Sequence, residues 1–283
     1  MERRRKVFGW GSIGDGLTGE EESAALERFS RLFGTSEFER RPVPDVAALE
    51  LPPPRLAPPA SLQAICSDAR YERALHCFGK SYSDAVQGLL GEYDGAPDIV
   101  IFPHNESEIA AALDWAASQG ATVTPFGGGS SVVGGVGSGR RTAAPVVTLD
   151  LRRFDRVLEV DRVSRSARIA AGVFGPALES QLKPHGLTLR HFPQSFEHST
   201  LGGWIATRSA GHYASLRTHI DDFVEGVRVV SPRGAIAMRR FPASGAGPSP
   251  ERLFIGSEGI LGVITEAWVR LSVRPTFRAG RAA

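Results

Sequence analysis

One stretch of sequence organises this chain: Pro125-Phe126-Gly127-Gly128-Gly129-Ser130-Ser131-Val132-Val133-Gly134-Gly135. It follows Ala121–Thr124, a largely β-branched run that predicts a short strand. Three consecutive glycines permit positive φ angles and let a backbone lie against a ligand. Loop N–H groups could converge on an anion, with the Ser130 and Ser131 hydroxyls as further donors. Taken alone, the residues leave two interpretations open: a phosphate-binding loop and a flexible surface turn.

The loop does not match the common nucleotide-binding motifs. The residues after it, 132–137, contain three glycines and three valines and predict no helix, so the strand–helix dinucleotide fingerprint is absent. The lysine of a Walker A loop is also missing.

Composition bounds the function. The chain has 283 residues, of which 42% are hydrophobic and 23% charged, so it can build a globular core. A formal net charge of +2 argues against nucleic-acid binding. Cys66 and Cys77 make neither a disulfide framework nor a zinc site. They fit a reducing compartment, and we expect a cytoplasmic location. We expect no integral membrane segment, since no apolar run is long enough to span a bilayer.

The glycine loop follows a strand–helix–strand pattern. Asp98–Phe102 is a continuous apolar run that predicts a buried strand. Asn105 and Glu108 then form a capping-box pattern that opens a helix, and Gly120 ends it. The second strand delivers the glycine loop at its end, where ligands often bind.

The remaining pattern predicts an α+β fold with many short, partly antiparallel strands. Residues 1–96 read as an extended or helical arm, because prolines crowd 42–59. The predicted strands cover 146–151, 157–160, 166–171, 187–189, 223–230, 235–240 and 263–273. The predicted helices cover 20–33, 83–90, 175–183 and 200–207.

Further segments accompany the loop: Phe192–Trp204, Thr207–Gly211 and Gly256–Glu266. Together with Pro125–Ser131 they closely resemble the flavin-binding domain of vanillyl-alcohol-oxidase-type flavoproteins. The alkylglycerone-phosphate (alkyl-dihydroxyacetone-phosphate) synthases are the most similar group. The resemblance runs from about Phe8 to about Leu271.

The resemblance implies a two-subdomain FAD-binding (PCMH/VAO-type) domain over 97–273, with subdomains at about 97–160 and 161–273 and a tail at 274–283. FAD would lie between the subdomains. The first glycine loop would take the pyrophosphate, 194–200 and 207–210 the flavin and ribityl side, and 258–264 the adenine and isoalloxazine region. The implied residues are Pro125, Phe126, Gly127, Gly128, Gly129, Ser130, Ser131, Gln194, Ser195, Phe196, Glu197, His198, Ser199, Thr200, Thr207, Arg208, Ser209, Ala210, Glu258, Gly259, Ile260, Leu261, Gly262, Val263 and Ile264.

Small residues let a backbone reach a flat ring, and hydroxyls suit ribityl oxygens, so the residue types agree with this assignment. Against it stands the interpretation that Gly202, Gly203, Gly259 and Gly262 only allow close packing. Relatives with a tethered flavin carry a histidine beside the first loop, where this chain has Ser130 and Ser131. We therefore expect non-covalent FAD. Valine at Gly128 should abolish FAD retention, by resisting a positive φ and by meeting the phosphate.

Two groups of side chains are weaker candidates for a functional role. His191 and His198 could face a flavin as proton donors or attachment points, but a lone loop histidine is more often a surface residue, which is our expectation here. His212, His219, Asp221 and Asp222 suggest a metal set by type, yet their spacing matches no standard site, so we expect no metal.

Three functions remain open. The first is an alkylglycerone-phosphate synthase-like enzyme of ether-lipid biosynthesis, which exchanges an acyl for an alkyl group on dihydroxyacetone phosphate. The second is an FAD-linked oxidase or dehydrogenase of a 2-hydroxy acid or alcohol. The third is a non-catalytic flavin-binding remnant, or a subunit of a split enzyme, that needs a cap-domain partner chain or a homodimer. In the synthase-like relatives the residues tied to chemistry lie in a later domain, so no catalytic residue is assigned.

Overall fold

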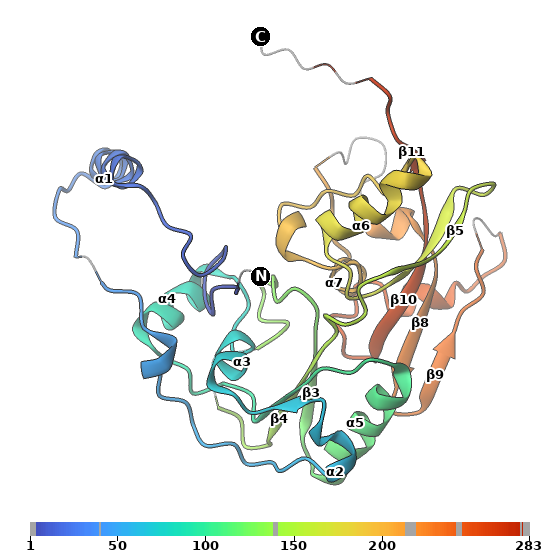
Figure 1. Cartoon of the computed structure of the whole chain (residues 1–283), viewed down its shortest axis with the longest axis horizontal. Helices are drawn as coiled ribbons and strands as arrows, with labels where there is room; N and C mark the ends of the chain where they lie inside the picture. The colour runs from blue at the N-terminus through green and yellow to red at the C-terminus, as the bar shows by residue number, and fades with distance from the viewer. Residues whose placement is uncertain are drawn as a thin grey trace.

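The computed structural model describes residues 4–39, 41–137, 141–212, 219–241, 245–277 and 279. Two sheets with their helices lie side by side, and the chain passes from the first to the second (Figure 1). Helix α1 (Gly19–Phe33) projects from the body and buries none of its residues. Within the described ranges, no helix has the length and apolar character needed to cross a bilayer.

The first sheet has the order β1-β2-β4-β3. Strands β2 (Ile99–Ile101), β4 (Val146–Asp150) and β3 (Thr122–Phe126) run parallel, and β1 (Cys66–Ser67) pairs antiparallel with β2. The predicted strand–helix–strand unit is present, but β4 lies between its two strands. Parallel β3 and β4 end at the same edge, where the glycine loop begins.

Helix α5 (Glu106–Ser118) connects β2 to β3 and begins as predicted. The Asn105 side chain accepts the Glu108 N–H at 2.9 Å. The Glu108 carboxylate accepts the backbone N–H of His104 at 2.7 Å, one residue before the position that a capping box would use.

Much of the expected N-terminal arm packs against this sheet. It contains η1 (Val46–Ala48), α2 (Ala60–Gln63), α3 (Arg70–Leu75) and α4 (Tyr82–Leu90). Leu62 and Ile65 join the main core. A second cluster of buried side chains consists of Val7, Leu49, Ala74, Leu75, Cys77, Phe78, Tyr93 and Ala96. Its members come from distant parts of 1–96, so this segment has a small core of its own, and it joins the first sheet where β1 pairs with β2.

The second sheet is antiparallel, with the order β5-β6-β10-β8-β9. Its strands are β5 (Val157–Asp161), β6 (Ser166–Ala170), β10 (Val263–Arg270), β8 (Val224–Ser231) and β9 (Gly234–Ala237). Because β5 pairs with β6, the sheets divide between Asp150 and Val157, slightly before the expected boundary. The strand expected over 263–273 breaks at Leu271, and its last part forms β11 (Ser272–Val273), which pairs with β7 (Leu187–Thr188).

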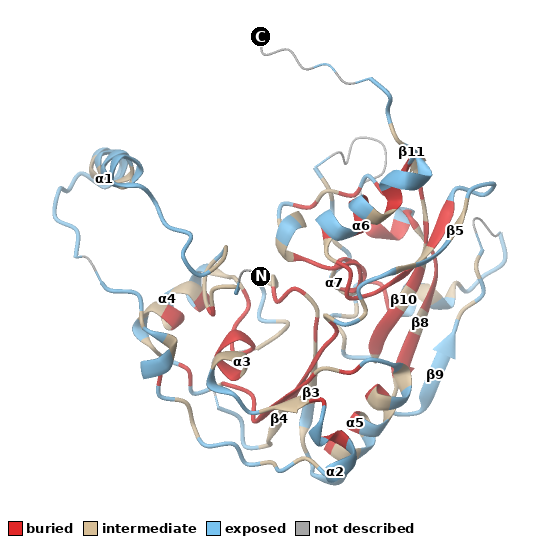
Figure 2. Ribbon diagram, in the orientation of Figure 1, coloured by how far each residue is buried: buried red, intermediate tan, exposed pale blue. Residues whose placement is uncertain are grey.

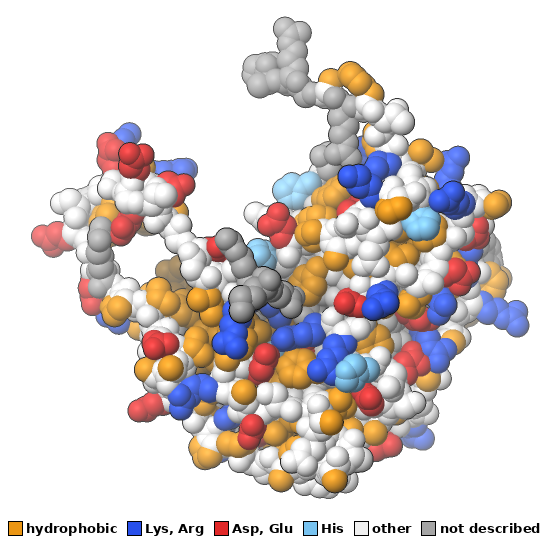
Figure 3. All heavy atoms as spheres, viewed as in Figure 1, with side chains coloured by type: hydrophobic (Ala, Val, Ile, Leu, Met, Phe, Trp, Pro, Cys, Tyr) orange, Lys and Arg blue, Asp and Glu red, His pale blue; other side chains and the backbone are white. Residues whose placement is uncertain are grey.

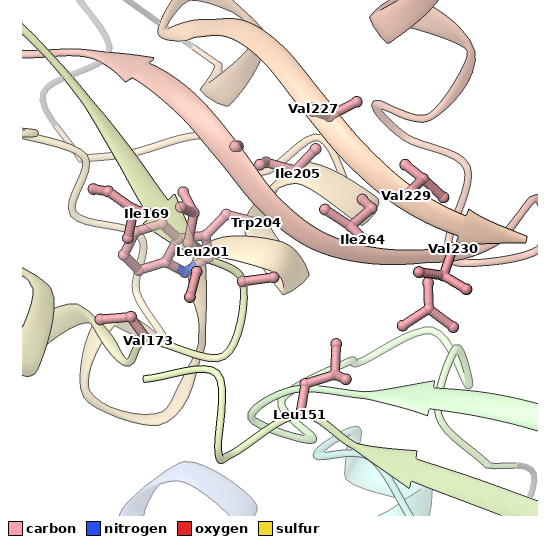
Figure 4. Close-up of a cluster of buried hydrophobic side chains, with 14 of the residues drawn as sticks. Leu151, Ile169, Val173, Leu201, Trp204, Ile205, Val227, Val229, Val230 and Ile264 are labelled. Carbon is pink, nitrogen blue, oxygen red and sulfur yellow. The ribbon is translucent and has the colours of Figure 1, made fainter. Parts of the chain in front are cut away.

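Helices α6 (Gly175–Leu182) and α7 (Leu201–Ala206) lie with the second sheet, together with the short turns η2 (Lys183–His185), η3 (Phe196–His198), η4 (Ile220–Asp222) and η5 (Pro250–Leu253). In this half, α7, β6, β8 and β10 contain many of the buried residues (Figure 2). The side chains of α7 pack beside Ile169, Val227 and Ile264 (Figure 4). Trp204 of α7 is only 1% exposed, so this helix is anchored by its apolar face.

One ion pair fastens the two halves together. Glu106, at the start of α5, accepts from Nε and Nη2 of Arg228 on β8, at 2.6 and 2.7 Å. The Thr265 hydroxyl on β10 donates to the same carboxylate at 2.6 Å. This two-bond contact links the start of α5 to the second sheet.

Candidate functional site

A cavity of about 300 Å³ lies between the two sheets. The glycine loop forms its wall on the first-sheet side, and α7 with the segment around Glu258 forms the wall on the other side. Basic, acidic and hydrophobic side chains are interspersed over the face of the molecule shown in Figure 3.

Most residues expected at the site line this cavity. They are Pro125, Phe126, Gly127, Gly128, Gly129, Ser130, Ser131, Ser195, Ser199, Thr200, Thr207, Ser209, Glu258, Gly259, Gly262 and Ile264. The other nine are absent from its lining: Gln194, Phe196, Glu197, His198, Arg208, Ala210, Ile260, Leu261 and Val263. Along the sequence, the nine residues absent from the lining lie between or next to those that line the cavity.

Several wall residues were not among the expected site residues: Val132, Val133, Gly135, Val136, Leu151, Ala171, Gly202, Gly203, Trp204 and Ala206. The position of Leu151 in the sequence could have identified it as a wall residue. It directly follows β4, and its N–H donates to the Phe126 carbonyl at the end of β3 at 2.9 Å. Strands that end at one edge place the residues after them together.

Each of the three central glycines is required by a close approach. A Cβ on Gly127 would meet the Thr200 hydroxyl, and one on Gly128 would meet the His198 carbonyl. Gly129 has a φ of 68°, and its Cβ would meet the Phe126 ring. The expected positive φ therefore falls at Gly129 and not at Gly128, whose constraint is contact with backbone.

The two glycines of α7 have different roles. A Cβ on Gly202 would lie 2.7 Å from that of Ala171, so Gly202 is a packing residue. A Cβ on Gly203 would have only the Thr200 hydroxyl nearby, at 3.4 Å, within the cavity wall. The space beside Gly203 is thus open toward the cavity, and close packing does not account for this glycine.

The segment after Gly256 joins both walls. The N–H groups of Gly256 and Glu258 donate to the carbonyls of Ile205 and Ala206, at 2.9 and 2.8 Å. Gly259, at a φ of 81°, would place a Cβ 3.3 Å from Pro125. Burial raises the pKa of Glu258. This segment therefore connects the end of α7 to the start of the glycine loop.

Hydroxyl groups line the second-sheet side of the cavity. The Ser199 hydroxyl accepts from Trp204 Nε1 at 2.7 Å and donates to the Ser195 carbonyl at 2.7 Å. The Thr207 hydroxyl donates to the Gly203 carbonyl at 2.9 Å. Polar oxygens beside an open stretch of helix backbone suit a flat, hydroxylated ligand such as a flavin with its ribityl chain.

His191 is not a surface residue, contrary to expectation. It is 2% exposed and lies beside the rings of Trp204 and Phe223. Its Nε2 lies 2.8 Å from the Ser209 hydroxyl on the cavity wall. Burial, with a smaller effect of His219, lowers its pKa to about 4, so the imidazole is neutral near pH 7. His191 therefore supports the wall from behind. His198 faces away from the cavity, beside the Trp10 ring.

The suggested metal set is not assembled. Across the residues that the structure describes, no three His, Cys, Asp or Glu side chains could hold a metal ion. Asp221 instead accepts from Arg208 and Arg252, at 3.0 and 2.7 Å.

Comparison with known proteins defines the class. Residues 97–238 match the model of the FAD binding domain family, a match that spans half of the chain. The chain belongs to this family. Its cofactor is therefore FAD. The cavity between the two sheets is lined mainly by small, hydroxyl-bearing and apolar residues.

Within this family, the chain is similar to alkyldihydroxyacetonephosphate synthases. The alkyldihydroxyacetonephosphate synthase of Dictyostelium discoideum is 40% identical over 74% of this chain and 34% of its own length. That of Trypanosoma brucei brucei is 35% identical over 84% of this chain and 41% of its own length. A solved alkyldihydroxyacetonephosphate synthase superposes with a TM-score of 0.84 at 32% identity, over 96% of this chain and 54% of that one.

Lower identity is found with FAD-linked oxidoreductases, including the glycolate oxidase subunit GlcD of Bacillus subtilis, at 32% over 65% of this chain and 39% of the relative. The similarity confirms the expected two-subdomain flavoprotein fold and the resemblance to the synthases. The chain spans well under half the length of each of these curated relatives.

Proposed function

We propose that this chain is the FAD-binding part of an alkyldihydroxyacetonephosphate synthase-like enzyme of ether-lipid biosynthesis, working in the cytoplasm. One observation carries the proposal. The structural likeness to the synthase covers 96% of this chain, and so includes most of residues 1–96, which lie outside the match to the FAD family. That segment packs onto the first sheet and contacts the glycine loop through Arg5 and Lys80. A likeness that extended only over the flavin-binding core would favour the oxidases equally.

Within the site, we propose that Gly127–Ser131 hold the pyrophosphate of FAD. The hydroxyls of Ser195, Ser199, Thr207 and Ser209 would face the ribityl and flavin side. Glu258–Ile264 would lie by the adenine and isoalloxazine region. The expected residues outside the cavity lining act in this proposal as supports of their neighbours. We propose non-covalent binding, since Ser130 and Ser131 offer no histidine for attachment beside the loop.

The bound flavin would supply the reactive ring for exchange of the acyl group for an alkyl group, without net oxidation. The residues of this chain bind and orient the cofactor. Among the described wall residues, Glu258 alone carries a carboxyl, imidazole or amino group, and the rest are mainly Gly, Ser, Thr and apolar residues. We therefore propose that acid–base groups for the exchange come from a cap domain, on a partner chain or in a homodimer.

The test is direct. The purified chain is expected to carry a yellow chromophore that bleaches on reduction, or to acquire it when FAD is added. A colourless protein that FAD cannot reconstitute would refute the proposal. With the cap domain of a synthase supplied, acyl-dihydroxyacetone phosphate and a fatty alcohol should yield ether lipid.

A second function, oxidation of a 2-hydroxy acid, is favoured by the similarity to the glycolate oxidase subunit. It predicts a different result in the same experiment. Glycolate or lactate would bleach the flavin, and no ether lipid would form.

A further inference from the structure

A small second pocket lies on the other side of the glycine loop from the large cavity. Arg5, Lys80 and His198 are among its lining residues. Phe126, Gly128 and Gly129 line both spaces. The loop therefore borders both the large cavity and a small pocket whose lining includes two cationic side chains.

Arg5 contacts the loop from behind. Its Nη1 donates to the Gly128 carbonyl at 2.9 Å, across 123 residues of sequence. The Tyr71 hydroxyl donates to the Arg5 carbonyl at 3.0 Å and so holds this N-terminal segment in place. The guanidinium also lies 5.7 Å from the centre of the Phe174 ring, which belongs to the second half of the molecule.

Lys80 contacts the other end of the loop. Its backbone N–H donates to the Ser131 carbonyl at 2.7 Å. A Cβ on the preceding Gly79 would collide with the same carbonyl, so the two backbones are in close contact. Among the described residues, the hydrogen-bond partner of the Lys80 ammonium group is the Lys6 carbonyl, at 3.4 Å.

These contacts have two consequences for an anion in the cavity. A carbonyl bound from behind cannot turn its lone pairs toward a phosphate in front. Neither cation has a direct ion pair: within the described parts of the chain, no carboxylate lies in salt-bridge contact with Arg5 or Lys80, although Asp150 attracts Arg5 and Asp84 attracts Lys80 at longer range. The nearby Asp150 pairs with His76 and Arg152, and Asp84 caps α4. Burial, followed by the charge of Arg5, lowers the pKa of Lys80 to about 8, because the opposing attraction of Asp84 offsets these two effects only in part.

We propose that Arg5 and Lys80 form a cationic backing for the glycine loop, which turns the Gly128 and Ser131 carbonyls away from the cavity and supplies positive charge to the pyrophosphate of FAD through the loop. This inference rests on the proposed assignment of the loop to pyrophosphate. Arg5 and Lys80 lie outside the segment that matches the FAD family, and in this proposal they position the loop that binds the cofactor.

The test compares charge-removing variants with matched controls. Arg5→Met and Lys80→Met are titrated with FAD and with riboflavin, which has the same ring and ribityl chain but no phosphate. Each variant should raise the Kd for FAD about tenfold, as for a lost charge-assisted contact, and leave the Kd for riboflavin unchanged. Arg4→Met and Lys6→Met remove the same charge from neighbouring positions whose side chains do not line the pocket, and should stay within about twofold of wild type.

Salt dependence separates charge from structure. Lys80→Met keeps the backbone bond to Ser131, so it should flatten the dependence of the FAD Kd on KCl concentration without lowering the melting temperature of the apoprotein. An unchanged FAD Kd in both variants would overturn the proposal. So would an equal loss of riboflavin and FAD affinity, which indicates a structural role alone. Failure of the wild-type protein to bind FAD would instead refute the proposed function itself.

Discussion

The carbonyl oxygen of His198 occupies the space into which a side chain at Gly128 would project. The two residues belong to different halves of the molecule, and their contact closes one edge of the cavity. Gly128→Ala must therefore push the glycine loop away from the 198–199 backbone. We expect a loss of about 1–3 kcal/mol in the free energy of unfolding, typical of overpacking, together with weaker FAD retention. Thermal denaturation of the apoprotein and flavin absorbance of the purified protein measure the two effects. An apoprotein as stable as wild type would contradict this geometry.

Gly203→Ala makes the opposite prediction for stability. A methyl group there meets only the Thr200 hydroxyl, and alanine favours a helix over glycine by up to about 1 kcal/mol. The apoprotein should be as stable as wild type or slightly more stable. The methyl group would project into the cavity, so the Kd for FAD should rise. If FAD affinity were unchanged, this part of α7 would not contact the cofactor.

The features predicted correctly are mostly those that residues close together in the sequence determine. The capping residues of α5, the proline at the start of α6 and the turn at 231–234 act within a few residues, and these elements formed close to the expected positions. The glycine segments were also recognisable, because each must approach another backbone or a ring. The prediction of FAD followed from their combination and is confirmed by the family match.

The remaining features depend on contacts between distant residues. The sequence could not tell that Gly129 takes the positive φ while Gly128 faces the His198 carbonyl, because His198 lies 70 positions away. The sequence also predicted an extended or helical arm over 1–96 without indicating where the arm would lie. In the structure Arg5 of this segment binds Gly128, and β1 extends the first sheet. His191 was expected at the surface because nothing near it in sequence reveals Trp204 and Phe223 around its ring.

The Glu106–Arg228 pair provides a test of how the two halves are held. Glu106→Gln would weaken a two-bond contact between α5 and β8, and would reduce the attraction of Thr265 for the same group. We expect a loss of about 1–2 kcal/mol in the free energy of unfolding. The Kd for FAD should also rise, since the opposing walls of the cavity belong to the two halves. Arg228→Lys, which cannot form both bonds, should have a similar effect, and the double variant should cost less than the sum.

A matched control for this pair lies on α1. Glu27 pairs with Arg31 four residues later, and both side chains are exposed. Glu27→Gln should change stability by less than about 0.5 kcal/mol and leave FAD binding unaltered. Equal effects of the two Glu→Gln changes would show that Glu106 has no special role between the sheets.

The burial of His191 should make the stability of the folded protein depend on pH. Its folded-state pKa of about 4 lies below the ordinary value of 6.5, because burial disfavours the imidazolium. Between these two values the unfolded chain binds more protons than the folded one, so stability falls as the pH drops. From pH 7 to pH 5 this single group should cost about 2 kcal/mol. His191→Phe keeps an aromatic ring between Trp204 and Phe223 but does not titrate, so urea denaturation should show a flatter pH profile over this range. The exposed His185 serves as the control, and His185→Gln should retain the wild-type slope. A His191→Phe profile parallel to that of wild type would show that His191 is not buried in its neutral form.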